Sequence, residues 1–375
     1  MGADTVVFVA NRGYALTSSR TNLLKHFLSC GWNVVIATAV DKESESLLDL
    51  GVFLEPVSFD RGGFSLLADL KTSRRLYSIY KKWRPSLVQH FHAKPVILGT
   101  LMARQALAGS VRIVNTITGL GHAFIVGGSS AKLASLGYRL ALPKADMTVF
   151  QNADDHALFA KQGWVSNSKS KIIVSSGIDM QRFPFVEREG EKNKAPVIVM
   201  LGRLLMQKGL EEFVEVARRI HKDIPNAKFL WAGEEDLVHP DSVSARWLQD
   251  KKDVEYVGRL ANVRNLLEKA DLLLFPSYRE GVPRVVLEAS AMGIPTVGFA
   301  VPGVREVVKN EQTGYLVENK NIEDLASKVK LLLEDKPLRL KMGKAARELV
   351  EHEFDINVVA KKYIKVYSQL GGKIT

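Results

Sequence analysis

The stretch "PVIVMLGRLLMQKGLEEFVEVA" at residues 196–217 contains the unit from which the whole fold is built. Its first part is a short apolar run rich in β-branched residues, which is typical of a buried strand. Its second part spaces Leu210, Phe213 and Ala217 as one face of a helix does. A strand that leads into an amphipathic helix is the repeating unit of a parallel sheet covered by helices.

The same alternation runs along most of the chain. Strand-like runs lie at 5–11, 32–39, 53–59, 87–92, 112–118, 147–152 and 171–177, and again at 196–203, 228–233, 254–259, 271–277 and 296–300. The charged segment 186–196 has no apolar period and is typical of a linker. We therefore expect two doubly wound α/β domains in tandem, with ligands beyond the carboxyl ends of their strands.

Length and composition limit the class of protein. A chain of 375 residues is long enough for two domains. It has no apolar run of the roughly 18 residues that suggest a membrane helix, and its start does not resemble a secretory signal. The single Cys30 excludes an internal disulfide and a cysteine zinc site. The expectation is a cytosolic protein.

The positive charge is concentrated in the first half of the chain. The formal net charge is +11, and residues 1–175, with 20 Lys and Arg against 11 Asp and Glu, supply +9 of it. We therefore expect an acidic partner at the N-terminal half. Nucleic acid is not expected, because no recognition-helix pattern or aromatic RNA-binding strand accompanies the charge.

Two cations follow the strand at 196–203. Arg203 lies at its end, and Lys208 with Gly209 opens the next helix. Two cations beside free helix N–H groups suit a diphosphate. The alternative is a solvated surface pair.

Two carboxylates flank the start of another predicted helix, in "EGVPRVVLEA" at 280–289. Glu280 lies in the loop before it. Glu288 lies inside the apolar helix, which is expected to run from Pro283 to near Gly293. Helix N–H groups between the acids could bind an anion, and carboxylates accept hydrogen bonds from sugar hydroxyls. This order matches a nucleoside diphosphate sugar; the alternative is one capping and one tolerated glutamate.

Gly13, in "ANRGYALTSSR", follows the first strand-like run. A glycine there lets the backbone approach a ligand closely, and the next helix offers N–H groups to an anion. An ordinary strand-to-helix turn explains the same residue equally well.

Together these residues resemble the retaining glycosyltransferases of family 4, which have the GT-B fold. The two glutamates of "EGVPRVVLEA" are similar to that family's Glu-x7-Glu motif, and "GRLLMQKG" to its Gly-Arg and Lys-Gly turn. "VSSGIDMQRF" at 174–183 resembles its domain-crossover segment, with Ser176 in place of the usual Asn. Segment 91–124 is similar to a subgroup that builds bacterial polysaccharides on a polyprenyl-diphosphate carrier, among them N-acetylhexosaminyl- and galactosaminyl-transferring members.

The resemblance covers nearly the whole chain and implies an architecture. It implies two Rossmann-like domains that face each other across a cleft. The first, at 1–187, would serve the acceptor and the membrane, and the second, at 188–356, would bind the nucleotide sugar. Residues 357–375 would form a helix that returns to the first domain.

The resemblance also implies roles for residues on the donor side. Glu280 would contact hydroxyls of the donor sugar and Glu288 those of the ribose. Arg203 and Lys208 would neutralise the diphosphate as it leaves, and backbone groups near Val257 would hold the base. The donor-binding set is Gly13, Gly202, Gly209, Gly233, Val257, Arg259, Gly281, Val282, Pro283, Leu287 and Glu288.

The acceptor side departs from the family pattern. Many members carry a His at the end of the fifth strand, where this chain has Thr118 and Gly119, with His122 as the nearest imidazole. His122 is therefore either a catalytic residue on the acceptor side or a loop residue without that role. His92 and Lys94 are the other acceptor-side candidates.

No metal or cofactor is expected. The chain has no Asp-x-Asp motif, which fits the family's metal independence, with the cations doing the work of a divalent ion. No second carboxylate is clearly placed as a nucleophile. We therefore expect retention by front-face attack, with the leaving diphosphate taking the acceptor's proton.

The densest basic segment is "KTSRRLYSIYKKWRP" at 71–85. On a helix, an apolar stripe that includes Leu76 and Ile79 would lie largely opposite a set of cations. The stripe comprises Leu76, Ile79, Tyr80 and Trp83, and the cations are Lys71, Arg74, Arg75 and Lys82. This is either an ordinary surface helix or a dock for anionic lipid head groups at the inner face of the cell membrane.

The sequence thus predicts a peripheral enzyme that moves a sugar, N-acetylhexosamine in the first instance, from a UDP-sugar to a polyprenyl-diphosphate-linked saccharide. Three alternatives stay open. One is a nucleotide-sugar epimerase on the same fold. Another is a glycosyltransferase with a different nucleotide sugar or a soluble acceptor. The third is a protein that binds a nucleotide sugar without turnover.

Overall fold

The computed structural model describes residues 3–60, 65–120, 128–188, 195–236 and 239–371. The chain forms two compact units. The N-terminal unit is Met1–Gly177 with Ile356–Thr375, and the C-terminal unit is Ile178–Asp355. The chain thus first leaves the N-terminal unit after Gly177, whereas the sequence predicted a domain boundary at 187. The charged segment indicates a linker, but the change of unit comes before that segment.

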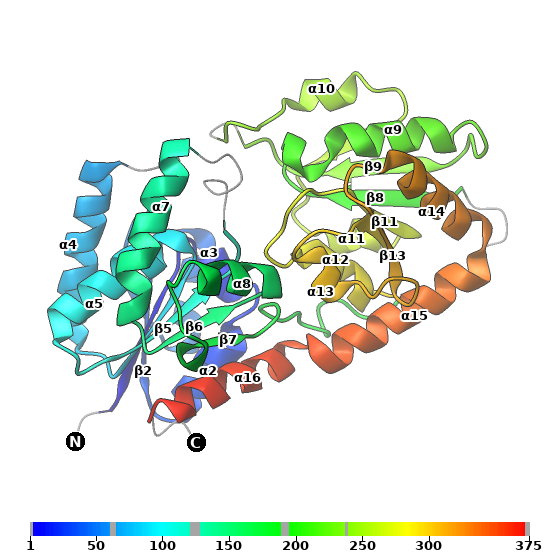
Figure 1. The fold of residues 1–375 in the computed structure, drawn as a ribbon. Coiled ribbons are helices and arrows are strands. Elements are labelled where there is room, and N and C mark those ends of the chain that lie inside the picture. The colour runs from blue at the N-terminus through cyan, green and yellow to red at the C-terminus, as the bar shows by residue number, and fades with distance from the viewer. Residues whose placement is uncertain (1–2, 61–64, 121–127, 189–194, 237–238, 372–375) are drawn as a thin grey trace. The chain divides into compact units, whose positions relative to one another are not determined.

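The N-terminal unit is built on a sheet of seven parallel strands in the order β3-β2-β1-β4-β5-β6-β7 (Figure 1). The strands are β1 (Thr5–Val9), β2 (Asn33–Thr38), β3 (Phe53–Pro56), β4 (Leu87–Phe91), β5 (Arg112–Ile117), β6 (Met147–Phe150) and β7 (Ser170–Ile172). Each lies within a strand-like run of the sequence or overlaps one. The prediction of a doubly wound parallel sheet is confirmed here.

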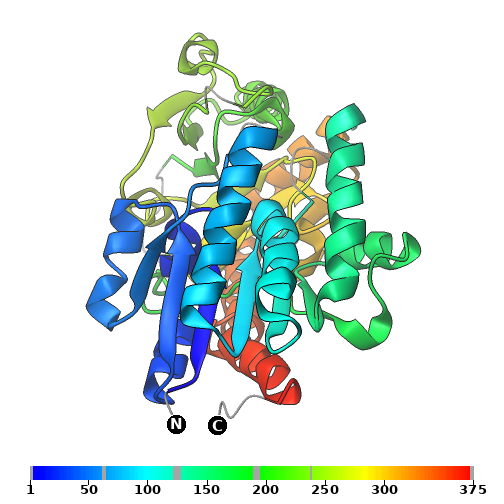
Figure 2. The same ribbon diagram turned by 90° about the vertical axis from the view of Figure 1, so that its left-hand side faces the viewer.

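Helices cover both faces of this sheet. They are α1 (Tyr14–Thr17), α2 (Thr21–Ser29), α3 (Lys42–Glu45), α4 (Leu66–Trp83), α5 (Thr100–Leu107), α7 (Gly128–Ala141), α8 (Ala153–Lys161) and α16 (Ile356–Gln369). Phe8 of β1 packs with Phe27 of α2 and Tyr363 of α16. Its neighbour Val7 packs with Ile79 of α4, because successive strand residues point to opposite faces. Figure 2 shows α4, α5 and α7 on the same side of the sheet.

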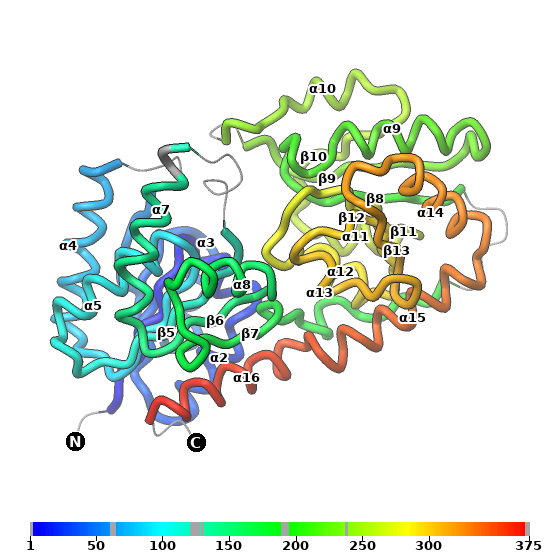
Figure 3. Tube along the Cα trace, in the orientation of Figure 1, coloured from blue at the N-terminus to red at the C-terminus, as the bar shows by residue number. Residues whose placement is uncertain are grey.

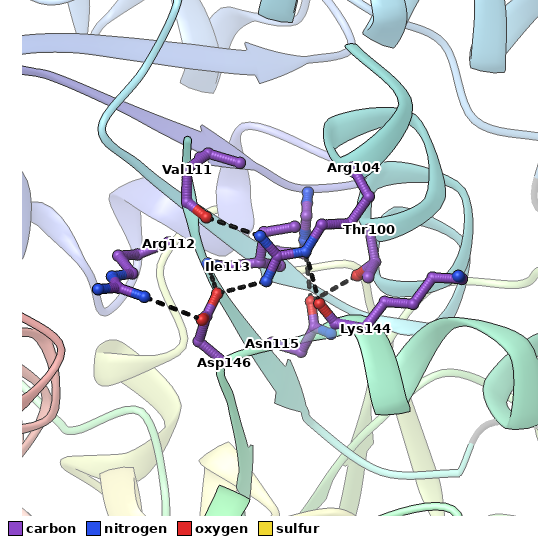
Figure 4. Close-up of polar contacts among 9 residues, drawn as sticks. Thr100, Arg104, Val111, Arg112, Ile113, Asn115, Lys144 and Asp146 are labelled. Carbon is purple, nitrogen blue, oxygen red and sulfur yellow. Dashed lines mark hydrogen bonds and ion pairs between the residues drawn. The ribbon is translucent and has the colours of Figure 1, made fainter. Parts of the chain in front are cut away.

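Arg104 ties α5 to β5 and β6 (Figure 4). Its Nε donates to the carbonyl of Lys144 at 2.7 Å, and its Nη1 donates to the carbonyl of Val111 at 2.9 Å. Its Nη2 pairs with Asp146 Oδ2 at 2.6 Å, and the backbone N–H of Ile113 donates to the same oxygen at 2.8 Å. These contacts lie where β5 and β6 begin, so this charge cluster fastens the scaffold at the edge away from the expected ligands.

The C-terminal unit has a sheet of six parallel strands in the order β10-β9-β8-β11-β12-β13. The strands are β8 (Val197–Leu201), β9 (Lys228–Ala232), β10 (Glu255–Gly258), β11 (Leu272–Phe275), β12 (Thr296–Phe299) and β13 (Gly314–Val317). The sequence analysis missed β13. Its four residues begin with a glycine, which weakens the strand pattern. Pairing with β12 makes it a strand.

The helices of this unit can be followed along the chain in Figure 3. They are α9 (Leu210–Ile220), α10 (Ala245–Gln249), α11 (Arg264–Leu267), α12 (Arg284–Ala291), α13 (Val304–Val307), α14 (Ile322–Glu334) and α15 (Lys336–Glu353). α12 is shorter than the predicted helix at its start, since Pro283 keeps an extended ψ of 114° and the first helical residue is Arg284. Among the described residues, no helix is both long and apolar enough to cross a bilayer.

Each sheet has one point where the strand order reverses. These switch points lie between β1 and β4 in the N-terminal unit and between β8 and β11 in the C-terminal unit. In open parallel sheets, connections on the two sides of a switch point leave in opposite directions, so a crevice forms outside the strand ends. A ligand-binding site is therefore expected among the residues that follow these four strands.

Candidate active site

At the switch point of the C-terminal unit, two residues named from the sequence meet. Lys208 ends the short 3₁₀ helix η5 (Met206–Lys208) after β8, and Glu280 lies in the loop after β11. Lys208 Nζ forms an ion pair with Glu280 Oε1. Ser277 Oγ donates to the same oxygen at 2.8 Å. Within the described residues, no side chain reaches Oε2 of Glu280, so this oxygen can accept a ligand hydroxyl.

The turn after Lys208 depends on Gly209. Its φ of +78° lies in the left-handed region, and a Cβ there would stand 2.2 Å from the carbonyl oxygen of Pro276. A side chain at this position would therefore push the Lys208 turn away from the end of β11. The backbone N–H of Tyr278 also donates to the carbonyl of Gln207 at 3.0 Å. These contacts fix the two loops that carry Lys208 and Glu280.

The start of α12 lies directly after Glu280. Gly281, Val282 and Pro283 form the approach to the helix, and the N–H of Val286 donates to the carbonyl of Pro283 at 3.2 Å. In general, the first N–H groups of an α-helix have no carbonyl of a preceding turn to bond, and the helix dipole is positive at this end. Such a helix start suits an anion, and anion binding here stays a prediction. The side chain of Leu287 is in the core, with 1% exposed.

Glu288 is a nearly buried carboxylate on α12. Its side chain is 9% exposed, and Oε1 accepts from Arg284 Nε at 3.1 Å. Burial raises the pKa of Glu288, while the charges of Arg284 and Arg182 act against that rise. The cations thus offset part of the cost of holding a carboxylate here. Its contact with a ribose stays a prediction.

Gly202 and Gly233, two glycines of the expected donor-binding set, lie at the carboxyl ends of β8 and β9, beside the end of β10. The N–H of Gly202 donates to Ala232 O, and the N–H of Gly233 donates to Gly258 O, both at 2.9 Å. A Cβ on Gly233 would lie 1.8 Å from Gly202 O, so only glycine permits this approach. Val257 is in β10, and the exposed Arg259 that follows pairs with Glu234 at 3.2 Å.

Arg203 does not stand alone at the end of β8. Its Nη1 forms an ion pair with Asp236, whose side chain is 14% exposed. The sequence analysis had assigned Arg203 to the diphosphate and did not foresee this carboxylate. A diphosphate would have to compete with Asp236 for Arg203, as it would with Glu280 for Lys208.

At the switch point of the N-terminal unit, Gly13 has a packing reason. Its N–H donates to Asp41 Oδ2 at 3.2 Å. A Cβ would lie 2.4 Å from Asp41 Oδ1 and from the backbone nitrogen of Ser44. Its φ of −56° is ordinary, and α1 has only four residues. Close packing against α3 therefore accounts for this glycine, and a donor phosphate there stays a prediction.

His92 follows β4 at the same switch point. Its φ of +72° is unusual for a residue with a side chain, and its Nδ1 is buried with no hydrogen-bond partner among the described residues. Burial, with the charge of Arg20 adding to it, lowers the pKa of His92 to about 4. Backbone strain and an unsatisfied nitrogen together are typical of a functional position.

Two family descriptions match the chain, one for each unit. Residues 5–152 match the description "Glycosyl transferase 4-like", and residues 181–349 match "Glycosyl transferases group 1". The chain is a family 4 glycosyltransferase with the GT-B fold. The family prediction from the sequence is thereby confirmed.

Three similar proteins place this glycosyltransferase more closely. It is 29% identical over 378 residues to the N,N'-diacetylbacillosaminyl-diphospho-undecaprenol alpha-1,3-N-acetylgalactosaminyltransferase of Campylobacter jejuni, covering 97% of this chain and 98% of that one. It is 28% identical over 307 residues to the UDP-Gal:alpha-D-GlcNAc-diphosphoundecaprenol alpha-1,3-galactosyltransferase of Escherichia coli, covering 78% and 77%. A solved glycosyltransferase from Rickettsia africae superimposes with a TM-score of 0.77 and 20% identity, over 100% of both chains.

The residues predicted for the acceptor side are only partly brought together. Thr118 and Gly119 follow β5, the neighbour of β4, so they end near His92 at the same sheet edge. Lys94 pairs with Asp69 in the first turn of α4 at 2.7 Å, so its charge is already neutralised. His122 lies outside the described residues.

Three residues that hold the loops predicted for the donor were not expected from the sequence. Tyr278 OH donates to Glu212 Oε1 on α9, and burial, followed by Glu212, raises the pKa of Tyr278. Ser277 donates to Glu280, and Asp236 pairs with Arg203. Ser277 and Tyr278 lie between the end of β11 and the motif that starts at Glu280, and that position was the available signal.

Proposed function

We propose that this glycosyltransferase moves a sugar, N-acetylhexosamine in the first instance, from a UDP-sugar to a polyprenyl-diphosphate-linked saccharide and retains the anomeric configuration. The contact of Lys208 with Glu280 at the switch point of the C-terminal unit carries the donor part of this proposal. It brings a cation, a carboxylate and the start of α12 into one place. Those three groups match diphosphate and sugar hydroxyls in the order that the donor presents them.

The acceptor part is supported by the relatives. Both are named for sugars carried on undecaprenol diphosphate, and the name of the Escherichia coli enzyme includes UDP-galactose. At identities of 29% and 28% the class of acceptor can be shared while the sugar differs. The choice of N-acetylhexosamine extends the sequence resemblance and the name of the Campylobacter jejuni enzyme.

In the proposed donor complex, the diphosphate lies at the start of α12 and takes Lys208 as a partner. Glu280 is then released from Lys208 and accepts hydroxyls of the sugar through its carboxylate. Glu288 accepts from the ribose, and the backbone near Val257 holds the base. Exchange of a carboxylate for a phosphate as the partner of Lys208 keeps the ammonium paired at every stage, so no buried charge is left alone.

The chemical step follows from where charge develops. The bond between the anomeric carbon and the β-phosphate oxygen breaks, and that oxygen gains negative charge. Lys208, Arg203 and the N–H groups at the start of α12 stabilise it. The acceptor hydroxyl attacks the same face of the sugar, and its proton passes to the departing phosphate oxygen. We propose that these cations make a divalent metal unnecessary.

The enzyme would act as a peripheral protein at the cytoplasmic face of the membrane that holds its acceptor. The excess of positive charge in residues 1–175 supports this placement, since anionic lipids attract basic surfaces.

The test combines the purified chain with single nucleotide sugars and with polyprenyl-diphosphate-linked N-acetylhexosamine, with and without EDTA. With a UDP donor we expect the mass of the acceptor to increase by one N-acetylhexosamine, with or without EDTA. NMR should show that the new glycosidic bond has the same anomeric configuration as the donor. Inversion of the anomeric centre would overturn the retaining mechanism, and loss of activity with EDTA would overturn metal independence.

The alternatives give different products in the same assay. An epimerase converts the donor alone, without acceptor. A glycosyltransferase for soluble acceptors transfers to free sugars and leaves the lipid-linked ones unchanged. A binding protein protects the donor loops from hydrogen exchange yet releases no UDP with any acceptor.

A further inference from the structure

Six leucines are exposed on two helices of the N-terminal unit. Leu66, Leu67 and Leu70 lie in the first turns of α4, with 85%, 83% and 48% of their surface exposed. On α7 the exposed leucines are Leu133, Leu136 and Leu140, with 43%, 50% and 51% exposed. We call these six residues the leucine surface. Single exposed leucines are ordinary, whereas several on the helices of one layer indicate an interaction surface.

The fold itself does not need this surface. α4 packs on the sheet through Leu76, Ile79 and Tyr80, which are fully buried. α7 buries a different face, which includes Ala134 and Tyr138. The leucines of α7 follow a spacing of three and four residues, which places them on one solvent face. The six leucines are therefore not part of the core against which each helix packs.

The two helices stand in the same layer. α5 packs against both α4 and α7, and Figure 2 shows α4 and α7 on either side of α5, with one end of each rising beyond it. Each of them follows a parallel strand, so both begin at the carboxyl edge of the sheet. Leu66, Leu67 and Leu70 in the first turns of α4 thus lie toward the edge at which the β1 and β4 switch point is found, whereas the leucines of α7 run from its second turn to its last.

The same helices carry almost only positive charge. α4 has five Lys and Arg residues and one Asp, and α7 has two cations and no acid. Glu55 binds Arg75 and Lys82, each at 2.6 Å, so two cations of the face expected from the sequence are neutralised within the protein. Among the described residues, Lys71, Arg74, Lys132 and Arg139 have no carboxylate within ion-pair distance.

We propose that the leucine surface inserts into the head-group region of an anionic phospholipid bilayer while the cations beside it bind lipid phosphates. Apolar side chains flanked by Lys and Arg are the composition that holds interfacial helices on membranes. A second copy of the chain fits less well, because a symmetric pair would set the same cations against each other. This inference rests on the proposed function, in which the acceptor's polyprenyl chain lies in the membrane.

This proposal changes which residues matter for membrane binding. A purely electrostatic dock would depend on the cations of 71–85 and vanish in salt. Insertion of leucines adds a part that salt does not remove, because burial of apolar surface is not screened. The two mechanisms therefore separate by salt dependence and by residue.

The test is flotation of the full chain with vesicles of phosphatidylcholine alone or with a minority of phosphatidylglycerol, in low and high salt. We expect Leu66→Ser with Leu67→Ser to lower binding to anionic vesicles at least about tenfold in both salts. Lys71→Ala with Arg74→Ala should lower it in low salt only. Leu48→Ser, which changes an exposed leucine of another helix, is the matched control and should bind as the unchanged chain does.

Three outcomes would overturn the proposal. They are wild-type binding by the leucine variant, no binding of the unchanged chain to any vesicle, and a concentration-dependent dimer in light scattering that the leucine variant abolishes. Circular dichroism and the thermal midpoint establish that each variant is folded, and Leu133→Ser with Leu136→Ser gives an independent second variant on α7.

Activity separates this proposal from the proposed function. With a short-chain acceptor in solution, the leucine variant should transfer as fast as the unchanged enzyme. With a long polyprenyl acceptor in vesicles, it should be slower by the loss in binding. If no transfer to either acceptor is seen, the proposed function fails while the flotation result still decides the membrane contact.

Discussion

The two switch points of the molecule hold polar groups of different kinds. In the C-terminal unit, oppositely charged side chains meet beyond the strand ends, with Lys208 and Glu280 as 19% and 14% exposed partners. In the N-terminal unit, the polar side chains inside β4 and β5 are neutral and fully buried, namely Gln89, His90, Asn115 and Thr116. His90 lies there between Tyr80 OH at 2.9 Å and Asn115 Oδ1 at 2.8 Å.

The difference concerns how easily the polar groups at each switch point can change their hydrogen-bond or ion-pair partners. An ion pair near solvent can give up one partner to a phosphate without leaving a charge alone in the protein. A buried neutral network cannot change partners cheaply, because each unpaired group costs free energy. The first arrangement suits binding and release of a charged donor, and the second suits a fixed scaffold. The following changes test that division.

The largest effect is expected at Lys208. Replacement by Ala removes a charge-assisted contact that we place on the diphosphate, worth roughly 1.5–3 kcal/mol. We expect kcat/KM to fall about 10- to 100-fold, with a thermal midpoint close to that of the unchanged enzyme. Glu288→Ala should also lower activity at least about tenfold. Steady-state release of UDP measures both.

The matched control is Lys330→Ala, which breaks an exposed ion pair with Asp223 in the same unit. Its kinetics should be unchanged. Normal kinetics in both Lys208→Ala and Glu288→Ala would contradict the donor-site model.

The next effect is expected at His90, and on stability. His90→Phe keeps an aromatic ring but removes the partner of Tyr80 OH and leaves Asn115 Oδ1 with Thr100 alone, a loss of about 2 kcal/mol. We expect faster hydrogen exchange in β4 and β5 and less than about a twofold change in kcat/KM per folded molecule. A strong kinetic loss without destabilisation would contradict the scaffold role.

The pH dependence of stability gives a smaller, graded effect. Burial lowers the pKa of His90 to about 4, below that of an exposed imidazole, near 6.5. As pH falls from about 6.5 toward 4, His90 becomes protonated in the unfolded chain but stays neutral in the folded chain. The free energy of unfolding therefore falls. The His90 share is about 1.4 kcal/mol per pH unit at most.

Denaturant titrations at pH 7 and pH 5 measure this slope. It should be shallower in His90→Phe, and unchanged in His352→Gln, which alters an exposed imidazole. Equal slopes in the unchanged chain and His90→Phe would show that His90 is not held neutral.

The smallest effect is expected at Arg112. It pairs with Asp146 at 3.4 Å with 57% of its side chain exposed, so Arg112→Ala should change stability by less than about 0.5 kcal/mol. Arg104→Ala removes the less exposed arginine of the same cluster, 24% exposed, together with its bonds to two backbone carbonyls (Figure 4), so it should cost several times more. Equal effects of the two changes on the thermal midpoint would contradict this ranking.

The sequence by itself determined the architecture and the donor motifs. Apolar runs and helical spacing are local properties, so they were enough to predict twelve of the described strands and the place of Lys208, Glu280 and α12. The alternation of strands and helices predicts a parallel sheet but not the order of its strands. β13 was missed because four residues are too few for a recognisable strand pattern.

The tertiary structure alone decided which side chains meet. The pairing of Arg203 with Asp236, of Tyr278 with Glu212 and of Lys94 with Asp69 joins residues that no spacing relates. Packing against Asp41 and Ser44 also explains why residue 13 is a glycine, and the leucine surface stays exposed. These features depend on what lies across the fold from each residue, and a linear pattern does not contain that information.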